Sequence, residues 1–200
     1  MKIIDHIQGS SEWLNWRKGI ITGTDASVII GSNPFKSPLD LYEEKLGLVS
    51  QQSDNAAMKR GRDLEPIARQ IAIEEIGVHF EPICVVHSDY YFMGASLDGY
   101  SECNGSILEI KCPSKDTHRL AVGGDIKPYY MTQIQHQLAC TGALKCYYFS
   151  YNPEYTEMIA ILEIKPDLDY IKAMIEAERK FYEEHLCLMN PPETWKLKLK

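Results

Sequence analysis

Residues 95–113 of this 200-residue chain read ASLDGYSECNGSILEIKCP, and this stretch decides the fold of the centre of the chain. Asn104-Gly105 is the strongest short hairpin signal in the sequence. The residues on either side are rich in β-branched and aromatic types, which predicts strands over Tyr90–Cys103 and Ser106–Cys112. Pro113 ends the second strand. The stretch therefore predicts an antiparallel β-hairpin.

Charged side chains gather on one face of this predicted hairpin. With a two-residue turn, Asp98 lies directly opposite Lys111 and diagonal to Glu109. Side chains alternate along a strand, so Glu109 and Lys111 share one face, while Leu108 and Ile110 point to the other. The hairpin therefore has one apolar face and one face on which two acids and a lysine converge.

A half-buried sheet gathers such groups only where they have a use or a partner. Carboxylates hold Mg²⁺ through oxygen, and the ion lowers the pKa of bound water and neutralises a substrate phosphate. A lysine beside the ion offsets charge in the transition state. The set is typical of metal-dependent phosphodiester hydrolysis. The alternative is a structural ion pair between Asp98 and Lys111, with Glu109 in solvent.

Helices and further strands are predicted around the hairpin. Ser10 or Ser11 can cap a short helix through Trp16, and Thr22 or Thr24 can cap a second. The other predicted helices are Leu39–Leu46, Ser53–Ile76, Pro128–Gly142 and Asp167–Leu188, and the other strands are Val78–His87, Lys145–Tyr151 and Glu157–Ile164. This order predicts one domain over residues 1–200, a mixed α/β fold with a central mixed β-sheet flanked by helices.

Composition restricts the class of protein. The chain is 44% hydrophobic, which is typical of a globular domain. Its net charge of −7 does not indicate a nucleic-acid binder, since such proteins usually carry a basic excess. A carboxylate metal site adds negative charge that bound cations offset. No apolar run reaches the roughly 20 residues of a membrane span, and no export signal is evident, so we expect a cytoplasmic protein. The six cysteines form no C-x-x-C pair, which disfavours a zinc ribbon or an iron–sulfur cluster.

Other conspicuous side chains have ordinary interpretations. The histidines show no metal-ligand spacing, and surface or capping roles are expected for His79, His87, His118, His136 and His185. Trp13 and Trp16 have helical spacing, which favours a core position over stacking on a DNA base. Glu65, taken alone, is typical of an exposed helix carboxylate, and Gln133 of an ordinary polar helix face that it shares with Gln137. Both lie on helices that can place them near the hairpin.

At the hairpin the sequence resembles the D…(D/E)-x-K signature of the PD-(D/E)XK nuclease superfamily. More narrowly, it resembles the lambda-exonuclease and YqaJ group of phage recombination nucleases, over roughly Ser11 to Asn152. The motifs that carry the resemblance occur in order: Trp13–Arg17 with Ile21–Asp25, Gly61–Glu65, Ala95–Gly99, Leu108–Pro113 and Tyr130–Gln135. The resemblance implies a restriction-endonuclease-like core, a mixed sheet flanked by helices.

The resemblance also implies roles for individual residues. Asp98 and Glu109 would be metal ligands, with the carbonyl of Ile110 as a third, and Lys111 would be the catalytic lysine. Glu65 would assist the site, and Gln133 would orient the attacking water. The implied cofactor is Mg²⁺, with two ions in each site and Mn²⁺ able to substitute. Arg17, Thr24 and Ser96 match positions that hold a 5′-phosphate, although Thr24 stands where serine is expected.

The function implied is a 5′→3′ exonuclease that degrades one strand of linear double-stranded DNA and leaves 3′ single-stranded tails for recombination. Members of the group are homotrimeric rings that partner a single-strand annealing protein. Three alternatives stay open: a structure-specific or nicking DNA endonuclease with the same chemistry, a catalytically dead DNA-binding module, and a helicase-associated nuclease with an iron–sulfur cluster. The cysteine positions disfavour the last, and the complete set of acids and lysine disfavours the second.

Overall fold

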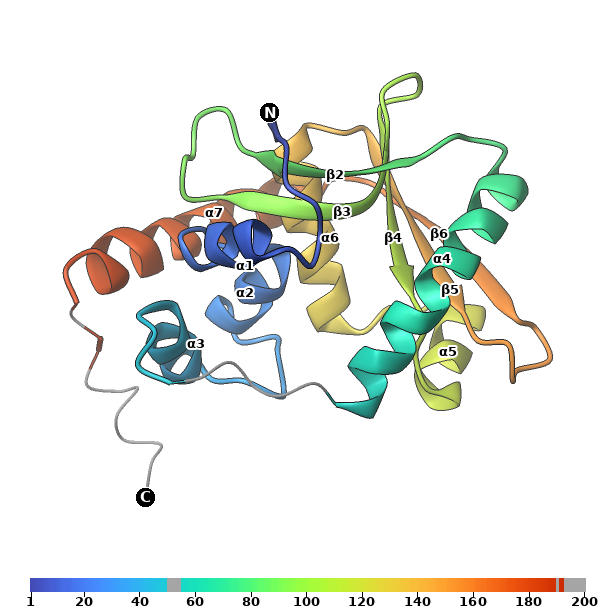
Figure 1. Cartoon of the computed structure of the whole chain (residues 1–200), viewed down its shortest axis with the longest axis horizontal. Helices are drawn as coiled ribbons and strands as arrows, with labels where there is room; N and C mark the ends of the chain where they lie inside the picture. The colour runs from blue at the N-terminus through green and yellow to red at the C-terminus, as the bar shows by residue number, and fades with distance from the viewer. Residues whose placement is uncertain (50–54, 190, 193–200) are drawn as a thin grey trace.

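The computed structural model describes residues 1–49, 55–189 and 191–192, and these fold around one six-stranded sheet. Neighbouring strands follow the chain order, and all pairs are antiparallel except β4 and β5, which are parallel (Figure 1). The strands are β1 Lys2–Ile4, β2 Glu81–Val86, β3 Gly94–Ser101, β4 Ser106–Lys111, β5 Lys145–Tyr151 and β6 Ile159–Ile164. The mixed α/β fold with a central mixed sheet is confirmed.

The helices lie where the periodicity predicts them, with two additions to the predicted elements. They are α1 Ser11–Lys18, α2 Gly23–Ile29, α3 Pro38–Lys45, α4 Ala56–Ile76, α5 Lys115–Val122, α6 Pro128–Thr141 and α7 Leu168–Lys180, continued by a π-helical turn over Phe181–Leu186. The sequence analysis missed β1 and α5. The predicted start of α4 at Ser53 lies outside the described residues, and in the structure Asn55 caps this helix.

Local signals set the first helices. Ser10 caps α1 by accepting a hydrogen bond from the backbone N–H of Trp13 at 3.1 Å. Thr22 and Asp25 form a capping box at the start of α2, in which each side chain accepts from the other residue's backbone. Ser37 and Asp40 form the same device on α3. These caps fix where the short N-terminal helices begin, although α1 buries no residue completely.

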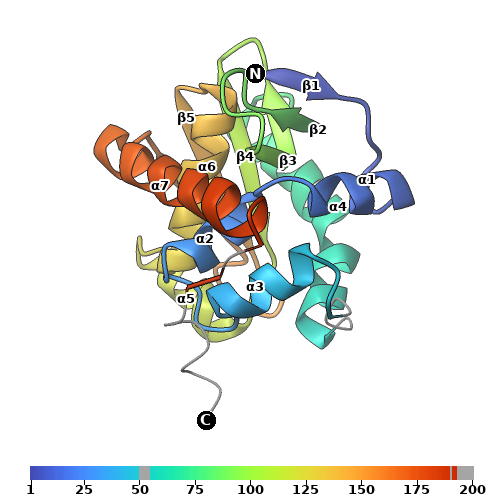
Figure 2. The same cartoon turned by 90° about the vertical axis from the view of Figure 1, so that its left-hand side faces the viewer.

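The sheet has a buried cluster on each face. Ile107 of β4 packs with Ile134 and Leu138 of α6, whereas Leu108 and Ile110 pack with α4. Figure 2 shows α4 on one side of the sheet and α6 and α7 on the other. Because side chains alternate, Glu109 and Lys111 share the α6 face, as predicted.

The hairpin register differs from the prediction. Ser101 pairs with Ser106, so the loop holds four residues and not two, and the ladder of β3 and β4 ends at Gly99↔Leu108. Asp98 therefore does not lie opposite Lys111. Gly105 adopts a left-handed φ of +60°, and a turn of this length built around a left-handed glycine is as regular as the two-residue turn. The local sequence suits both turns.

Four other expectations are wrong. His118 and His136 are fully buried, not superficial: the ring of His136 bonds Glu178 at 2.8 Å and thereby joins α6 to α7. Trp13 and Trp16 are only half-buried and lie outside the two core clusters.

Among the described helices, none combines the length and the apolar character that crossing a membrane requires.

Candidate active site

The Glu109 carboxylate is the most enclosed acid of the hairpin, with 1% of its surface exposed. Its Oε1 accepts from the amide of Gln133 at 2.7 Å, and its Oε2 accepts from the amide of Gln137 at 2.6 Å. Both glutamines stand on α6, one helical turn apart, and reach down onto β4. Lys111 pairs with the same Oε1. The predicted alternative, an Asp98–Lys111 ion pair with Glu109 in solvent, is wrong.

The Lys111 ammonium lies between acids and an aromatic ring. Its Nζ stands 5.1 Å from the centre of the Tyr130 ring, in cation–π geometry, while its partner is Glu109. Burial by itself would lower the pKa of Lys111, but the charges of Glu109 and Asp98 outweigh burial and raise it. Lys111 therefore stays protonated over the physiological range, and it presents positive charge beside both acids.

Asp98 lies where β3 separates from β4. Its Oδ2 accepts a hydrogen bond of 2.7 Å from the backbone N–H of Ile110, so the carboxylate is tied to the strand that carries Glu109. Burial, and then the charge of Glu109, raise the pKa of Asp98 well above its usual range. The half-buried carboxylate of Asp98 and the buried carboxylate of Glu109 thus repel each other across the end of β4, and a cation between them would relieve that repulsion.

The donor set fits a hard divalent cation. Asp98 and Glu109 could supply carboxylate oxygens, and Ile110, which follows Glu109 and bonds Asp98 through its N–H, could supply a backbone carbonyl. Within the described residues no group of three or more histidines, cysteines or acids lies close enough to form a metal site by itself. Mg²⁺ does not need one, because it commonly binds through one or two carboxylates and keeps several waters.

Glu65 reaches this centre only indirectly. It lies on α4, on the opposite face of the sheet from α6, and its carboxylate pairs with Arg69 at 2.5 Å. Arg69 Nε in turn donates to the carbonyl of Asp98 at 2.9 Å. The charge of Glu65 contributes to the raised pKa of Asp98, after burial and Glu109. Glu65 is therefore near the acid pair without a direct contact to either member.

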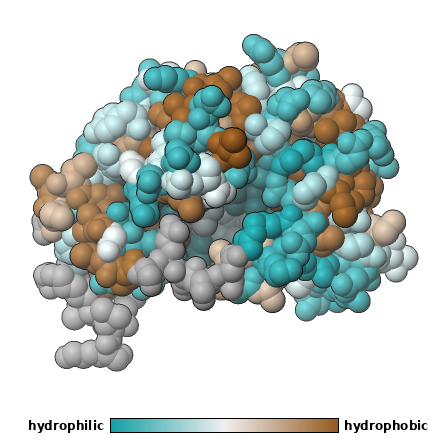
Figure 3. Space-filling model, viewed as in Figure 1, coloured by the Kyte–Doolittle hydropathy of each residue, from teal (hydrophilic) through white to brown (hydrophobic). Residues whose placement is uncertain are grey.

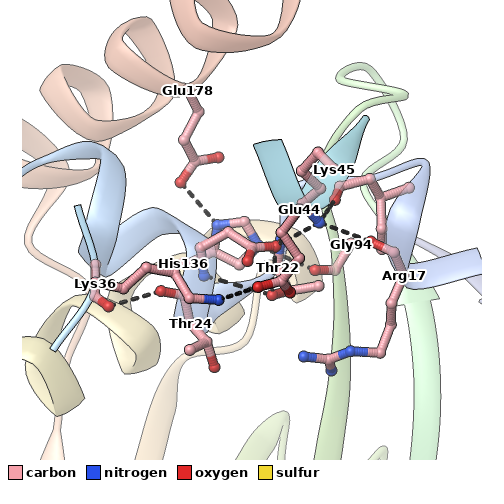
Figure 4. Close-up of polar contacts among 12 residues, drawn as sticks. Arg17, Thr22, Thr24, Lys36, Glu44, Lys45, Gly94, His136 and Glu178 are labelled. Carbon is pink, nitrogen blue, oxygen red and sulfur yellow. Dashed lines mark hydrogen bonds and ion pairs between the residues drawn. The ribbon is translucent and has the colours of Figure 1, made fainter. Parts of the chain in front are cut away.

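Of the three residues predicted to hold a phosphate, the structure brings Arg17 and Ser96 together, and no contact of the described residues joins Thr24 to them. Ser96 Oγ accepts from the indole N–H of Trp13 at 2.7 Å, and the Arg17 guanidinium lies 4.5 Å above the same Trp13 ring. Trp13 thus links Arg17 to Ser96. Thr24 is exposed at the start of α2, and Figure 4 shows its side chain and the Arg17 guanidinium pointing toward the same side of the view.

A buried ion pair holds this N-terminal region to α3. Lys45 Nζ lies 2.7 Å from Asp25 and donates to the carbonyl oxygens of Arg17, at 2.7 Å, and Ile20, at 2.5 Å (Figure 4). The side chains of Lys45 and Asp25 are 7% and 12% exposed. Lys45 therefore stabilises the turn between α1 and α2 and binds the backbone of Arg17 itself.

Close packing brings α2 next to the acid centre. A Cβ added at Gly23 would lie 2.8 Å from Cγ of Gln133 and 3.1 Å from its backbone oxygen. Only glycine allows α2 to approach α6 this closely. Thr24 directly follows Gly23, so it lies close to α6, the helix whose glutamines bind Glu109. On the face shown in Figure 3 the surface is hollowed in the middle, between the N-terminal helices and α4, and the walls of the hollow are hydrophilic.

The contacts of four residues in these groups were missed from the sequence. Gln137 was interpreted as an ordinary polar helix position, yet it is buried on Glu109; its spacing of four residues from Gln133 was the available signal. Trp13 has no local signal for a bond to Ser96, 83 residues away. Lys45 and Asp25 are equally non-local, because they lie on different helices.

Comparisons with known proteins identify the family of the chain. A model of the YqaJ-like viral recombinase domain matches residues 12–144. The protein YqaJ of Bacillus subtilis (strain 168) is 30% identical over 186 residues, which are 86% of this chain and 55% of that protein. Protein R354 of Acanthamoeba polyphaga mimivirus is 30% identical over 165 residues, 72% of this chain and 29% of its own length. The chain thus spans about half, or less, of these relatives.

Solved structures show the same fold. The alkaline exonuclease of Laribacter hongkongensis is 29% identical and superposes with a TM-score of 0.77, over 94% of this chain and 97% of that one. The same enzyme in complex with dAMP gives 0.78. A phage-related exonuclease from Haemophilus somnus 129PT is 16% identical, with a TM-score of 0.66, and shows the fold alone. Because the family model matches residues 12–144, which is more than half of the chain, this chain belongs to the YqaJ-like viral recombinase domain family.

Proposed function

We propose that this chain is a metal-dependent deoxyribonuclease that degrades one strand of linear double-stranded DNA from its 5′ end and leaves 3′ single-stranded tails. The observation that carries the proposal is the enclosure of Glu109 by Lys111, Gln133 and Gln137 beside a second, half-buried acid, Asp98. The likeness to the alkaline exonuclease of Laribacter hongkongensis, at 29% identity over nearly the whole of both chains, supports the same class of reaction.

Each residue of the centre has a part in this chemistry. Asp98, Glu109 and the Ile110 carbonyl would hold Mg²⁺ or Mn²⁺, as one ion or two. The ion would lower the pKa of a bound water and neutralise the scissile phosphate. Lys111 places a permanent positive charge where negative charge develops in the transition state. Gln133 and Gln137 fix the orientation of the Glu109 carboxylate, as second contacts of metal ligands do.

Recognition of the DNA end is assigned to the group around Trp13. The guanidinium of Arg17 suits a terminal phosphate by charge and by its planar fork of donors. The hydroxyls of Ser96 and Thr24 would complete the pocket. Every cleavage from the 5′ end creates a new 5′-phosphate, so binding at this pocket would draw the DNA forward. The proposal includes assembly as a homotrimeric ring on DNA and cooperation with a single-strand annealing protein.

The test is hydrolysis of three DNA substrates: a linear duplex with 5′-phosphates, the same duplex with 5′-hydroxyls, and the closed circle. With Mg²⁺ or Mn²⁺ the phosphorylated duplex should release mononucleotides, and the circle should stay intact. Excess chelator should abolish the reaction, and Ca²⁺ should bind without supporting turnover. Full activity in chelator contradicts the metal mechanism. Cutting of the circle favours the second candidate, a structure-specific or nicking endonuclease that uses the same carboxylates and lysine.

A further inference from the structure

The loop between α2 and α3 holds an aromatic ring out in solvent. Phe35 is 75% exposed, among the most exposed large apolar side chains of the described residues. It lines a shallow pocket of about 330 Å³ together with other residues of the same loop. An exposed phenylalanine loses the free energy that its burial would bring. A single exposed apolar residue is common, so exposure alone assigns it no role.

The loop is fastened in a way that fixes this exposed position. Asn33 is bonded to Ser27 through both its backbone and its side chain, at 2.9 and 3.0 Å, and its Oδ1 accepts from the N–H of Phe35 at 2.8 Å. Ser32 bonds the hydroxyl of Thr132 on α6 at 2.9 Å. These polar bonds fix the backbone just before Phe35 and hold the Phe35 N–H. They present the ring in one place.

From Phe35 a line of aromatic rings leads to the catalytic lysine. The Phe35 ring packs edge-on against Tyr129 with centroids 5.7 Å apart, and Tyr129 lies 4.4 Å from Tyr130. The Lys111 ammonium stands 5.1 Å from the Tyr130 ring. Duplex DNA rises about 3.4 Å per nucleotide on each strand, so Phe35 lies within a few nucleotides of a phosphate at Lys111.

Cations accompany the rings. Lys111 Nζ stands over the ring of Tyr130, the neighbour of Tyr129, and Lys127 is the N-cap residue of α6, two positions before Tyr129. Flat rings combined with positive charge are the surface on which nucleic-acid bases stack while cations follow the backbone. A protein partner would explain the exposed ring, but not its continuity with the lysine at the acid centre.

We propose that Phe35 and Tyr129 form a stacking platform for nucleobases of the DNA strand that enters the active site, within a few nucleotides of the scissile phosphate. The inference rests on the proposed function, because it assigns base contacts to the same DNA substrate. The platform recognises any base, since every base has a flat face. It therefore contributes affinity and placement without sequence specificity.

The experiment compares Phe35→Leu, Phe35→Trp and the wild-type chain in binding to a short duplex by fluorescence anisotropy, with Ca²⁺ in place of Mg²⁺. A matched duplex carries abasic residues at the last positions of the 5′-phosphorylated strand. Tyr91→Leu is the control, because Tyr91 is 65% exposed and packs edge-on against Tyr182, an aromatic pair like that of Phe35 and Tyr129.

Phe35→Leu should raise the Kd for the intact duplex by about tenfold, the loss expected from one stacked base. The wild type should lose a similar factor on the abasic duplex, and Phe35→Leu should lose little more, since both changes remove one contact. Phe35→Trp should retain affinity, and Tyr91→Leu should match the wild type.

Equal affinity of Phe35→Leu and the wild type for the intact duplex overturns the platform. So does a conversion of the wild-type oligomer to monomer by Phe35→Leu in sedimentation with DNA affinity unchanged, which would assign the ring to an interface between copies of the chain. The binding measurement needs no turnover. A wild-type chain that binds DNA through Phe35 but cleaves none would therefore sink the proposed function and leave the platform standing.

Discussion

The acid centre and the N-terminal region hold their functional groups in different ways. At the acid centre, Glu109 is 1% exposed and is held by Lys111 of its own strand and by two amides of α6. In the N-terminal region, Arg17 lies on a short helix with no fully buried residue, and one buried ion pair between Lys45 and Asp25 fastens the turn behind it. The sheet fixes the groups proposed for chemistry. A few polar contacts fix the groups proposed for recognition.

This contrast has a physical consequence. A carboxylate enclosed by three donors cannot turn, so its oxygens are preorganised for a metal ion. Groups on α1 and α2 depend on the anchor at Lys45, because local caps alone do not hold a short helix in place. Damage to the acid centre should remove the reaction itself. Damage to the N-terminal region should change the choice of DNA end and the stability of the fold.

The largest expected effect is that of Lys111→Ala at the acid centre. Loss of the fixed positive charge should slow single-turnover hydrolysis by ~10³-fold or more, with DNA binding largely retained. Lys115→Ala is the matched control, because Lys115 is 59% exposed and lies 3.7 Å from Glu154. A Lys111→Ala enzyme that keeps most of its rate would leave this lysine as a structural partner of Glu109.

The second prediction concerns the ion pair between Lys45 and Asp25, which holds the N-terminal region in place. Lys45→Met leaves Asp25 charged and buried without its partner, which should lower the free energy of unfolding by about 3–5 kcal/mol in urea denaturation at neutral pH. Lys36→Met, which removes a pair with Glu44 whose side chains are about one-fifth exposed, should cost about 1 kcal/mol or less. Similar losses from both variants would contradict the role of Lys45 as the anchor.

The pH dependence of the Lys45→Met effect has a definite sign. Burial alone would raise the pKa of Asp25, but Lys45 and Arg17 outweigh burial and lower it. The pair therefore stabilises the fold above the ordinary aspartate pKa, and this contribution is lost as the pH falls through the folded-state value. The stability difference between the wild type and Lys45→Met should narrow on acidification. A stability difference that widens as the pH falls would contradict the assignment of Lys45 as the partner that keeps Asp25 charged.

A smaller effect is expected from Gln137→Leu, which removes one of the two amides that orient Glu109. The Glu109 Oε2 would lose its donor, and metal affinity or activity should fall by about 10- to 100-fold, as for other groups that orient metal ligands. Mg²⁺ titration of the initial rate measures it. Thr141→Val, near the end of the same helix, serves as the control. An unchanged half-saturating Mg²⁺ concentration would mean that Gln133 alone orients the carboxylate.

The smallest effect concerns the DNA end. Arg17→Ala should reduce the preference for 5′-phosphorylated over 5′-hydroxyl duplexes by about tenfold, the value of one charge-assisted contact, and should shorten processive runs under a DNA trap. Lys18→Ala, an exposed neighbour on the same helix, should leave the preference intact. A preference that survives Arg17→Ala would move the assignment toward the endonuclease.

The sequence predicted those parts of the molecule that depend on local pattern. The helix predicted over Leu39–Leu46 is α3, alternation placed Glu109 and Lys111 on one face, and Asn104-Gly105 marked the hairpin. It failed where two local solutions compete, as in the loop length that sets the partner of Asp98. Element β1 was missed because three residues are too short for a pattern.

The residues of the site show the same difference between local and non-local signals. Asp98, Glu109 and Lys111 follow from the hairpin, and the motif resemblance adds Gln133 and Arg17. The contacts of Trp13 with Ser96 and of Lys45 with Asp25 join residues from separate elements, and only packing decides them. The sequence also assigned Gln137 and His136 to unremarkable polar positions, because periodicity does not show which polar side chains of a helix are buried.

The central claim is that Asp98 and Glu109 bind a divalent cation. The most direct measurement is anomalous diffraction from crystals of this chain soaked in Mn²⁺. The account predicts a peak at coordination distance from oxygens of both carboxylates and from the Ile110 carbonyl, absent in Asp98→Asn crystals, with the Lys111 ammonium displaced from Glu109 Oε1 but still beside the ion. Crystals with no peak there, and Lys111 still paired with Glu109 at saturating Mn²⁺, would contradict it.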